Sequence, residues 1–284
     1  MIAFAREGRG TCKPLVGFDR PLGRSWLNEQ QQRAVRHLWQ SPDRVMLLRG
    51  AAGTGKTTLL QEAVEGIEAA GHRVVALAPS AEASRGVLRE AGFQDADTVA
   101  RFLQDPRLQE QARFGVLLID EASLLGARTL SRVFHLAQKL DSRVILVGDV
   151  QQHGSVERGA AFRLLQERAA VPVVEVTDIR RQKGRYRAAV RLLSEGKVAE
   201  GFTLLDRLGW VEELPAAQRE RRLAAAYLAA VSAPKRGGEP RTALVVSPTH
   251  AEGARVTAAI RGALQAAGKL GEERGRLPSG RRRD

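Results

Sequence analysis

The sequence predicts an α/β fold in which a parallel sheet lies between layers of helices on both faces. Between residues 45 and 176, short apolar runs rich in β-branched residues alternate with amphipathic stretches. Strands that are buried on both faces of a parallel sheet have such continuous apolar runs, and helices usually connect them. The predicted strands are residues 45–48, 74–78, 116–119, 144–147 and 173–176.

Composition supports a globular chain that has a polyanionic partner. Its 284 residues are 43% hydrophobic, which is enough for one large domain or two ordinary ones. Forty-five Lys and Arg residues against 32 Asp and Glu residues give a net charge of +13, which favours nucleic acid, although a solvated basic surface would also explain it. Cys12 is the only cysteine, and no apolar run is long enough to span a membrane, so we expect a cytoplasmic protein without a membrane partner.

The first predicted strand runs into a glycine-rich loop that fits the phosphate-binding pattern G-x-x-x-x-G-K-[ST]. Such a loop surrounds phosphates with backbone N–H groups, while its lysine reaches the terminal phosphates and the hydroxyl after it faces Mg²⁺. The alternative is a glycine-rich turn that binds no ligand. A phosphate loop after the first strand predicts a RecA-like P-loop NTPase with ATP and Mg²⁺ as cofactors. The predicted nucleotide-binding residues in this loop are Gly50, Ala51, Ala52, Gly53, Thr54, Gly55, Lys56, Thr57 and Thr58.

Two adjacent acids, Asp120 and Glu121, follow the strand at residues 116–119. In an NTPase, a carboxylate at a strand end shares Mg²⁺ with the loop hydroxyl, so we expect Asp120 and Thr57 to be the metal ligands. Glu121 is then the candidate base for the attacking water. An acidic pair after a strand is common by itself, and only its combination with a phosphate loop favours catalysis.

Two further catalytic candidates follow the next two strands. Gln152 ends the segment 148–152, where a glutamine can bond both the γ-phosphate and the attacking water. The alternative is an ordinary Gly-Asp turn at a strand end. Arg181 follows the strand at 173–176 and is placed to direct a guanidinium at the phosphates, although arginine is too frequent in this chain for spacing to decide.

The pattern predicts five regions along the chain. A lead segment covers residues 1–26, the RecA-like motor domain 27–182, and a helical connecting region 183–231. After a linker rich in Pro and Gly, residues 241–267 read as the start of a second RecA-like domain, with a strand at 242–247 and a helix at 250–267. Residues 268–284 are rich in Gly, Arg and Glu, so we expect a basic disordered tail.

The motifs together resemble the superfamily 1B helicases of the RecD-like type, and among them the helicase portion of conjugative relaxases. The segment 27–35 resembles the glutamine motif that reads adenine, with Gln31 on its glutamine, and 50–58 matches motif I. Residues 78–83 resemble motif Ia, 98–103 the strand-contacting segment after it, and 120–123 motif II. Residues 148–162 resemble motif III, Arg181 and Gln182 the arginine pair of motif IV, and 246–250 the opening of the second motor domain.

The resemblance implies ATP-driven translocation on single-stranded DNA with 5′ to 3′ polarity, and other relaxase or conjugation components as further partners. It places the DNA contacts at Ser80, Thr98, Arg101, Phe102 and Thr249, with the ring of Phe102 stacking on a base or else packing in the core. The family's later motifs, one of which supplies an arginine to the ATP site, have no counterpart here. Two alternatives therefore stay open: an ATP- and DNA-binding module that does not unwind, and a P-loop small-molecule kinase.

Overall fold

The computed structural model describes residues 1–50, 53–149, 155, 157–178, 184–234 and 241–270. The chain divides into two compact units, Met1–Leu208 and Gly209–Asp284, and each is described by itself. The boundary between the two units falls at residue 208, and the five regions expected from the sequence stay a prediction.

Within the described residues, the first unit contains a six-stranded sheet in the order β3-β2-β4-β5-β1-β6. All neighbouring strands pair in parallel, which confirms the predicted α/β class. The strands are β1 (Val45–Gly50), β2 (Val74–Ala78), β3 (Asp97–Thr98), β4 (Val116–Ile119), β5 (Arg143–Gly148) and β6 (Val173–Val176). Only β3 was missed by the sequence analysis, because its two polar residues carry no apolar run and extend the sheet solely by pairing with Leu77 and Ala78.

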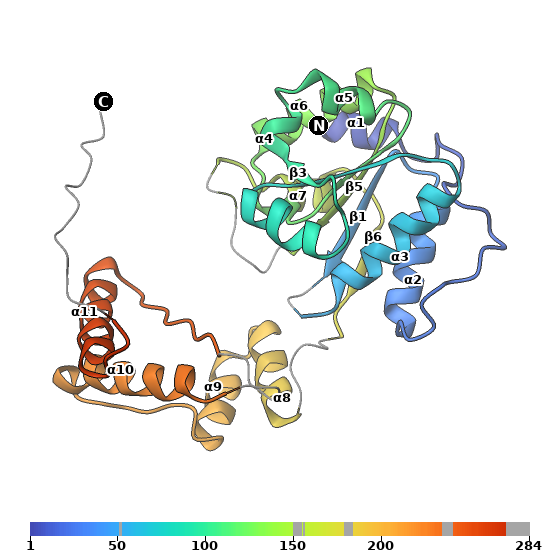
Figure 1. The fold of residues 1–284 in the computed structure, drawn as a ribbon. Coiled ribbons are helices and arrows are strands. Elements are labelled where there is room, and N and C mark those ends of the chain that lie inside the picture. The colour runs from blue at the N-terminus through green and yellow to red at the C-terminus, as the bar shows by residue number, and fades with distance from the viewer. Residues whose placement is uncertain (51–52, 150–154, 156, 179–183, 235–240, 271–284) are drawn as a thin grey trace. The chain divides into compact units, whose positions relative to one another are not determined.

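The sheet has a hydrophobic core on each face, because successive side chains of a strand point to opposite sides. In β1, Val45 and Leu47 join one core, while Met46 and Leu48 join the other. Figure 1 shows α2 and α3 on one flank of the sheet and α1, α5 and α6 on the other. Helices therefore cover both faces, as predicted.

The helical elements of this unit are α1 (Ile2–Glu7), α2 (Glu29–Gln40), α3 (Lys56–Ala69), the π-helix η1 (Glu82–Leu88), α4 (Val99–Phe102), α5 (Pro106–Gln111), the 3₁₀ turn η2 (Ala122–Leu124), α6 (Ala127–Lys139), α7 (Ala161–Arg168), α8 (Gly184–Ser194) and α9 (Val198–Arg207). The start of α2 is fixed by a reciprocal cap: the Asn28 side chain accepts from the Gln31 N–H, and the Gln31 side chain accepts from the Asn28 N–H. Trp39 then packs α2 against α3 at Gly66, where an added Cβ would lie 2.3 Å from the indole.

The lead segment 1–26 is part of the first compact unit. Ala5 is buried in one core, while Leu15 and Val16 are buried in the other. The segment belongs to the fold because its apolar residues complete both faces of the sheet, although they are too few to form a core of their own.

In the second unit, the described residues form two helices, α10 (Ala216–Ser232) and α11 (His250–Ala266), which contact each other. The strand expected at residues 242–247 is not formed, although the helix after it is. Leu244 is 88% exposed and Val246 is 80% exposed. A lone extended segment cannot satisfy its backbone hydrogen bonds, and the described residues of this unit offer it no second strand.

Most of the predicted tail, residues 271–284, lies outside the described residues. Among the residues that are described, none of the helices is long and apolar enough to cross a bilayer.

Candidate nucleotide site

The sheet register brings the phosphate loop and the acid pair to one edge. Ile119 of β4 pairs with Leu146 of β5, which in turn pairs with Leu47 of β1. Asp120 therefore lies one residue beyond this row of paired residues. It follows β4, which is two strands away from β1, the strand that leads into the phosphate loop. Two strand spacings amount to about 10 Å, a gap that a lysine side chain and a bound phosphate can bridge.

Two glycines of the phosphate loop have left-handed backbone. Gly53 and Gly55 have φ values of 79° and 76°, in the left-handed region that side chains disfavour. Lys56 is the first residue of α3, so the loop amides and the helix N-terminus face the same place, which is favourable for an anion. The Nζ of Lys56 donates to the Gly50 carbonyl at 2.6 Å. A Cβ added at Gly50 would lie 2.7 Å from the Lys56 side chain, so this close approach requires glycine.

The acid pair lies within electrostatic reach of Lys56. Burial raises the pKa of the Asp120 carboxyl, and it is opposed by a hydrogen bond from the Glu121 N–H and by the positive charge of Lys56. Desolvation, followed by the negative charge of Asp120, raises the pKa of Glu121 against the same lysine. Glu121 has a left-handed φ of 51°, and its N–H donates to Asp120 Oδ1 at 2.8 Å. A nearby cation favours the charged form of a carboxyl group, so two buried carboxyl groups with raised pKa values are suited to a cationic ligand.

The chemistry of these donors fits ATP with Mg²⁺. Thr57 lies in the first turn of α3, next to Lys56, and is partly buried. Its hydroxyl and the Asp120 carboxylate are hard oxygen ligands, which Mg²⁺ takes in small number beside phosphates and waters. Thr58 is the next residue of the same turn, whereas Ala51 and Ala52 lie outside the described residues.

Gln31 has a structural role that the sequence analysis missed. Its side chain is 1% exposed, and its Nε2 donates to the Thr54 carbonyl in the phosphate loop at 3.0 Å. A side chain at position 55 would collide with this amide, because an added Cβ would lie 2.7 Å from Gln31 Nε2. The contact to adenine stays a prediction, since in this structure the amide is directed into the protein.

Replacing Gln31 by alanine should lower the free energy of unfolding of the nucleotide-free protein by about 1–3 kcal/mol, because the buried Thr54 carbonyl loses a donor. Urea unfolding followed by circular dichroism measures this change. Gln138→Ala, at an exposed position on α6, is the matched control. A loss no larger than that of the control would show that Gln31 does not support the loop.

The remaining catalytic candidates, Gln152 and Arg181, lie outside the described residues, but the chain leading to each is anchored near the site. The Asp149 N–H donates to Ser123 Oγ at 3.4 Å, beside the acid pair. At the end of β6, Gln30 Oε1 accepts from the N–H groups of Thr177 and Asp178, at 3.0 and 3.1 Å. The first turn of α2 therefore contacts both the phosphate loop and the strand end that precedes Arg181.

Three of the DNA-contact candidates lie after β2 and at β3, at the carboxyl edge of the sheet. Ser80 is exposed, and its Oγ accepts from the Ala83 N–H at the start of η1. Thr98 caps α4 by accepting from the Arg101 N–H at 3.1 Å. The Arg101 side chain is 53% exposed and pairs with Asp97 at 2.6 Å.

Asp97 is a buried carboxylate that the sequence analysis overlooked. Burial acts to raise its pKa, but the Thr98 N–H, Arg85 and Arg101 outweigh burial and hold the pKa below its ordinary value. Arg89 also approaches it, at 3.8 Å. The spacing of Asp97 and Arg101, four residues apart, was the available signal for this contact. The result is an arginine cluster, defined as Arg85, Arg89 and Arg101, around one buried acid.

Phe102 and Thr249 do not join this surface. Phe102 is 0% exposed in a hydrophobic core, so the prediction that its ring stacks on a base is wrong. Its position inside α4 turns the ring towards the sheet, where burial of an aromatic side chain is favourable. Thr249 caps α11 in the second unit, where its Oγ1 accepts from the Glu252 N–H at 3.2 Å, and its DNA contact stays a prediction.

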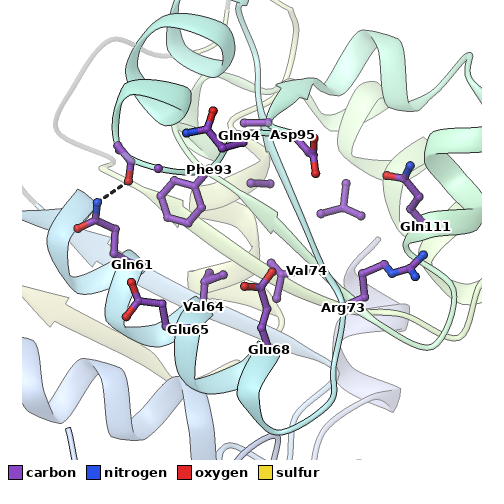
Figure 2. A pocket seen from close by; sticks show the side chains of 15 residues that line it. Gln61, Val64, Glu65, Glu68, Arg73, Val74, Phe93, Gln94, Asp95 and Gln111 are labelled. Carbon is purple, nitrogen blue, oxygen red and sulfur yellow. Dashed lines mark hydrogen bonds between the residues drawn. The ribbon is translucent and has the colours of Figure 1, made fainter. Parts of the chain in front are cut away.

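A separate hollow of about 590 Å³ lies beside the sheet, between α3, the start of β2 and the loop before β3. Figure 2 shows Glu65, Glu68 and Phe93 around it, together with the hydrogen bond from the Gln61 side chain to the Ala91 carbonyl. Its lining includes none of the phosphate-loop residues and neither acid of the pair. The hollow is therefore separate from the candidate nucleotide site at the strand ends.

Comparison with known proteins identifies the family of the chain. A family profile described as AAA domain matches residues 26–216. The chain is 30% identical over 204 residues to the conjugal transfer protein TraA of Rhizobium radiobacter, which covers 70% of this chain and 18% of that protein. It is 32% identical over 212 residues to the multifunctional conjugation protein TraI of Escherichia coli strain K12, covering 70% and 12%. It is 31% identical over 168 residues to the ATP-dependent RecD2 DNA helicase of Deinococcus radiodurans, covering 57% and 23%.

The matched region thus spans less than a quarter of each of these relatives. The residues that the family profile matches include the sheet and its acid pair. The resemblance seen in the motifs is confirmed. Since the profile covers more than half of the 284 residues, the chain belongs to the AAA-domain family, and its relatives include conjugal transfer proteins and RecD-type helicases.

Proposed function

We propose that this chain is an ATP-driven motor domain that moves 5′ to 3′ on single-stranded DNA, as the motor portion of a relaxase-type conjugation protein. The observation that carries the proposal is the convergence of Lys56, Asp120 and Glu121 at one edge of the sheet. Lys56 Nζ donates to the carbonyl of Gly50 in the phosphate loop, and its charge acts on both acids, whose pKa values are raised. They form a set suited to nucleotide hydrolysis.

Each side chain has a defined task in this proposal. Lys56 and the loop amides bind the phosphates. Gln31 stabilises the loop conformation through its hydrogen bond to the Thr54 carbonyl. Glu121 accepts the proton of the attacking water once the loss of its own proton is favoured by positive charge in the site. Gln152 and Arg181 are proposed to contact the γ-phosphate from the segments after β5 and β6. Bound Mg²⁺, held by Thr57 and Asp120, would supply charge neutralisation at the phosphates.

The DNA partner is supported by charge and by the exposed arginine cluster. The net charge of +13 attracts a phosphate backbone, and the guanidinium groups of Arg85 and Arg101 are about half exposed at the sheet edge. Asp97 holds these groups in place, and each retains donors for a phosphate. Ser80 and Thr98 lie beside them as hydroxyl contacts. We place the protein in the cytoplasm with other conjugation components, in keeping with its single cysteine.

The test is ATP turnover with and without a single-stranded oligonucleotide at low salt. We expect at least tenfold stimulation by single strands, less by a blunt duplex of equal length, and a steep decline as salt is raised. A fork with a 5′ tail should unwind, and a fork with a 3′ tail should not. Absence of turnover under all these conditions would contradict the proposal.

A second candidate is a module that binds ATP and DNA without unwinding. The observation that favours it is the second unit, whose described residues form two helices and no strand. Stimulated turnover with neither fork opened would select this function. Phosphate transfer to a small acceptor instead of water would indicate the kinase alternative, for which the acid pair and the basic charge have no use.

A further inference from the structure

The edge strand β3 carries a buried carboxylate that binds arginines from two different elements. Asp97 pairs with Leu77 of β2, and its side chain is only 3% exposed. Its Oδ1 accepts from Nη2 of Arg85 at 3.1 Å, and its Oδ2 accepts from Nη1 of Arg101 at 2.6 Å. Arg85 belongs to η1 and Arg101 to α4, so a single acid holds two guanidinium groups next to each other.

The acid is itself held in a fixed position. The Thr98 N–H donates to Asp97 Oδ1 at 2.7 Å, which sets the orientation of the carboxylate. Arg89 donates from Nε to the carbonyl of Ala96, directly before the acid, at 2.9 Å, and its Nη2 lies 3.8 Å from Asp97 Oδ2. Because both its backbone and its carboxylate are bonded in this way, Asp97 determines where the guanidinium groups lie.

The two guanidinium groups keep donors for a further acceptor. An arginine has five N–H donors in a planar fork, and Asp97 takes one hydrogen bond from each side chain. The side chains of Arg85 and Arg101 are 50% and 53% exposed, so solvent and ligands reach them. A guanidinium fork fits the oxygens of a phosphate, which it binds with two parallel hydrogen bonds.

The charges of this site fit one phosphodiester. The arginine cluster contacts two carboxylates, Asp97 and Asp105, and one positive charge is left over. A phosphodiester carries a single negative charge. Part of the cluster lies on η1, a π-helix, and this rare conformation is frequent at functional sites.

The cluster is separate from the candidate nucleotide site. In the sheet, β3 is four positions away from β1, the strand that leads into the phosphate loop. Four strand spacings amount to about 19 Å, which is too far for the phosphates of a nucleotide bound at that loop. The anion that this cluster fits is therefore a different one.

We propose that Asp97 is a positioning residue that holds Arg85 and Arg101 as a clamp for one backbone phosphate of single-stranded DNA. The inference rests on the DNA binding in the proposed function and deepens it by naming the acid that orients the contact. The local interpretation is that Asp97 only neutralises nearby arginines in the folded protein. The two interpretations predict opposite changes in DNA affinity when the charge of the acid is removed.

The first experiment measures binding of a fluorescent oligo-dT to the nucleotide-free protein by anisotropy, over a series of salt concentrations. Asp97→Asn makes the protein more positive by one charge, so attraction alone predicts tighter binding. We expect binding that is weaker by at least about fivefold, because the arginines lose their preorganisation. The slope of log Kd against log salt should also fall by about one, since one phosphate contact is lost.

The matched control is Asp95→Asn, which makes the same charge change at an exposed position of the same loop. Its Kd should equal that of wild type or be slightly lower, because added positive charge favours DNA. A Kd in folded Asp97→Asn that is equal to or below the wild-type value would overturn the proposal.

The second experiment keeps the charge and removes the fork. Arg85→Lys combined with Arg101→Lys leaves the net charge unchanged at two half-exposed positions, so it decides the question even if Asp97→Asn does not fold. We expect a loss of affinity of at least about fivefold, because an ammonium group is a point charge without the planar fork. Arg107→Lys, at an exposed position of α5, should stay close to wild type. Unchanged affinity in the double lysine variant would overturn the clamp.

The outcomes separate this inference from the proposed function. A wild-type protein that does not bind oligo-dT at low salt would contradict both. Wild-type binding that Asp97→Asn leaves intact would overturn the clamp alone. Both experiments omit ATP, so a protein that binds DNA through the clamp but does not hydrolyse ATP would contradict only the motor function.

Discussion

Replacing Lys56 by alanine is expected to abolish ATP turnover, with a loss in kcat/KM of at least about a hundredfold to a thousandfold, which is typical when one charge-stabilising donor is removed. The lysine is the first residue of α3, its Nζ rests 2.6 Å from the Gly50 carbonyl, and it is the positive charge that acts on both Asp120 and Glu121. Release of phosphate, with and without single-stranded DNA, measures the effect.

The matched control is Lys139→Ala, which removes an exposed lysine at the end of α6. It should leave turnover within twofold of wild type, even though the net charge changes equally in the two variants. Residual turnover above one tenth in Lys56→Ala would place the chemistry elsewhere.

Asp120→Asn is expected to have two opposite effects: it should remove Mg²⁺-dependent turnover by at least about a hundredfold, and it should raise the melting temperature of the nucleotide-free protein at neutral pH. The first effect follows from the loss of a metal-binding oxygen anion. The second follows because burial raises the pKa of the carboxyl, which means that its charged form is disfavoured in the folded protein.

The pH dependence gives the sign of the second effect. A carboxyl whose pKa is higher in the folded than in the unfolded state binds more protons when folded, so stability is lost as the pH rises from its ordinary value through the raised one. Thermal unfolding of wild type and variant should therefore differ most at neutral pH and converge below about pH 4. Asp19→Asn, at an exposed position, should show no such gain. A variant no more stable than wild type at pH 7 would show that burial of the Asp120 carboxylate does not destabilise the folded protein.

Much of the fold could be predicted from local patterns. Five apolar runs matched five strands, because strands buried on both faces leave a continuous signature in sequence. The glycine-rich pattern predicted a phosphate loop after the first strand, and the acids at 120 and 121 were placed at a strand end. The local sequence was sufficient to predict these features, because each depends only on its own residues and their immediate neighbours.

Other assignments needed the folded protein. Phe102 reads equally well as a base-stacking or a core residue, and only the packing of α4 against the sheet decided for the core. The segment 242–247 has the composition of a strand, yet a strand exists only where another edge pairs with it. The position of Gln31 in a motif predicts a contact with adenine, which stays a prediction, and only the folded protein shows that its amide also donates to the Thr54 carbonyl.

By itself, the sequence determined the sheet class, the phosphate loop and the acid pair, because apolar periodicity and turn chemistry act over a few neighbouring residues. Only the tertiary structure decided which polar groups support them. Gln31 and Thr54 are 23 residues apart, and Thr129 and Glu157 are 28 apart, and no local pattern records such a pairing. These partners are selected by burial: a carbonyl or a helix end that loses water must find a donor or an acceptor, and the fold determines which side chain is within reach.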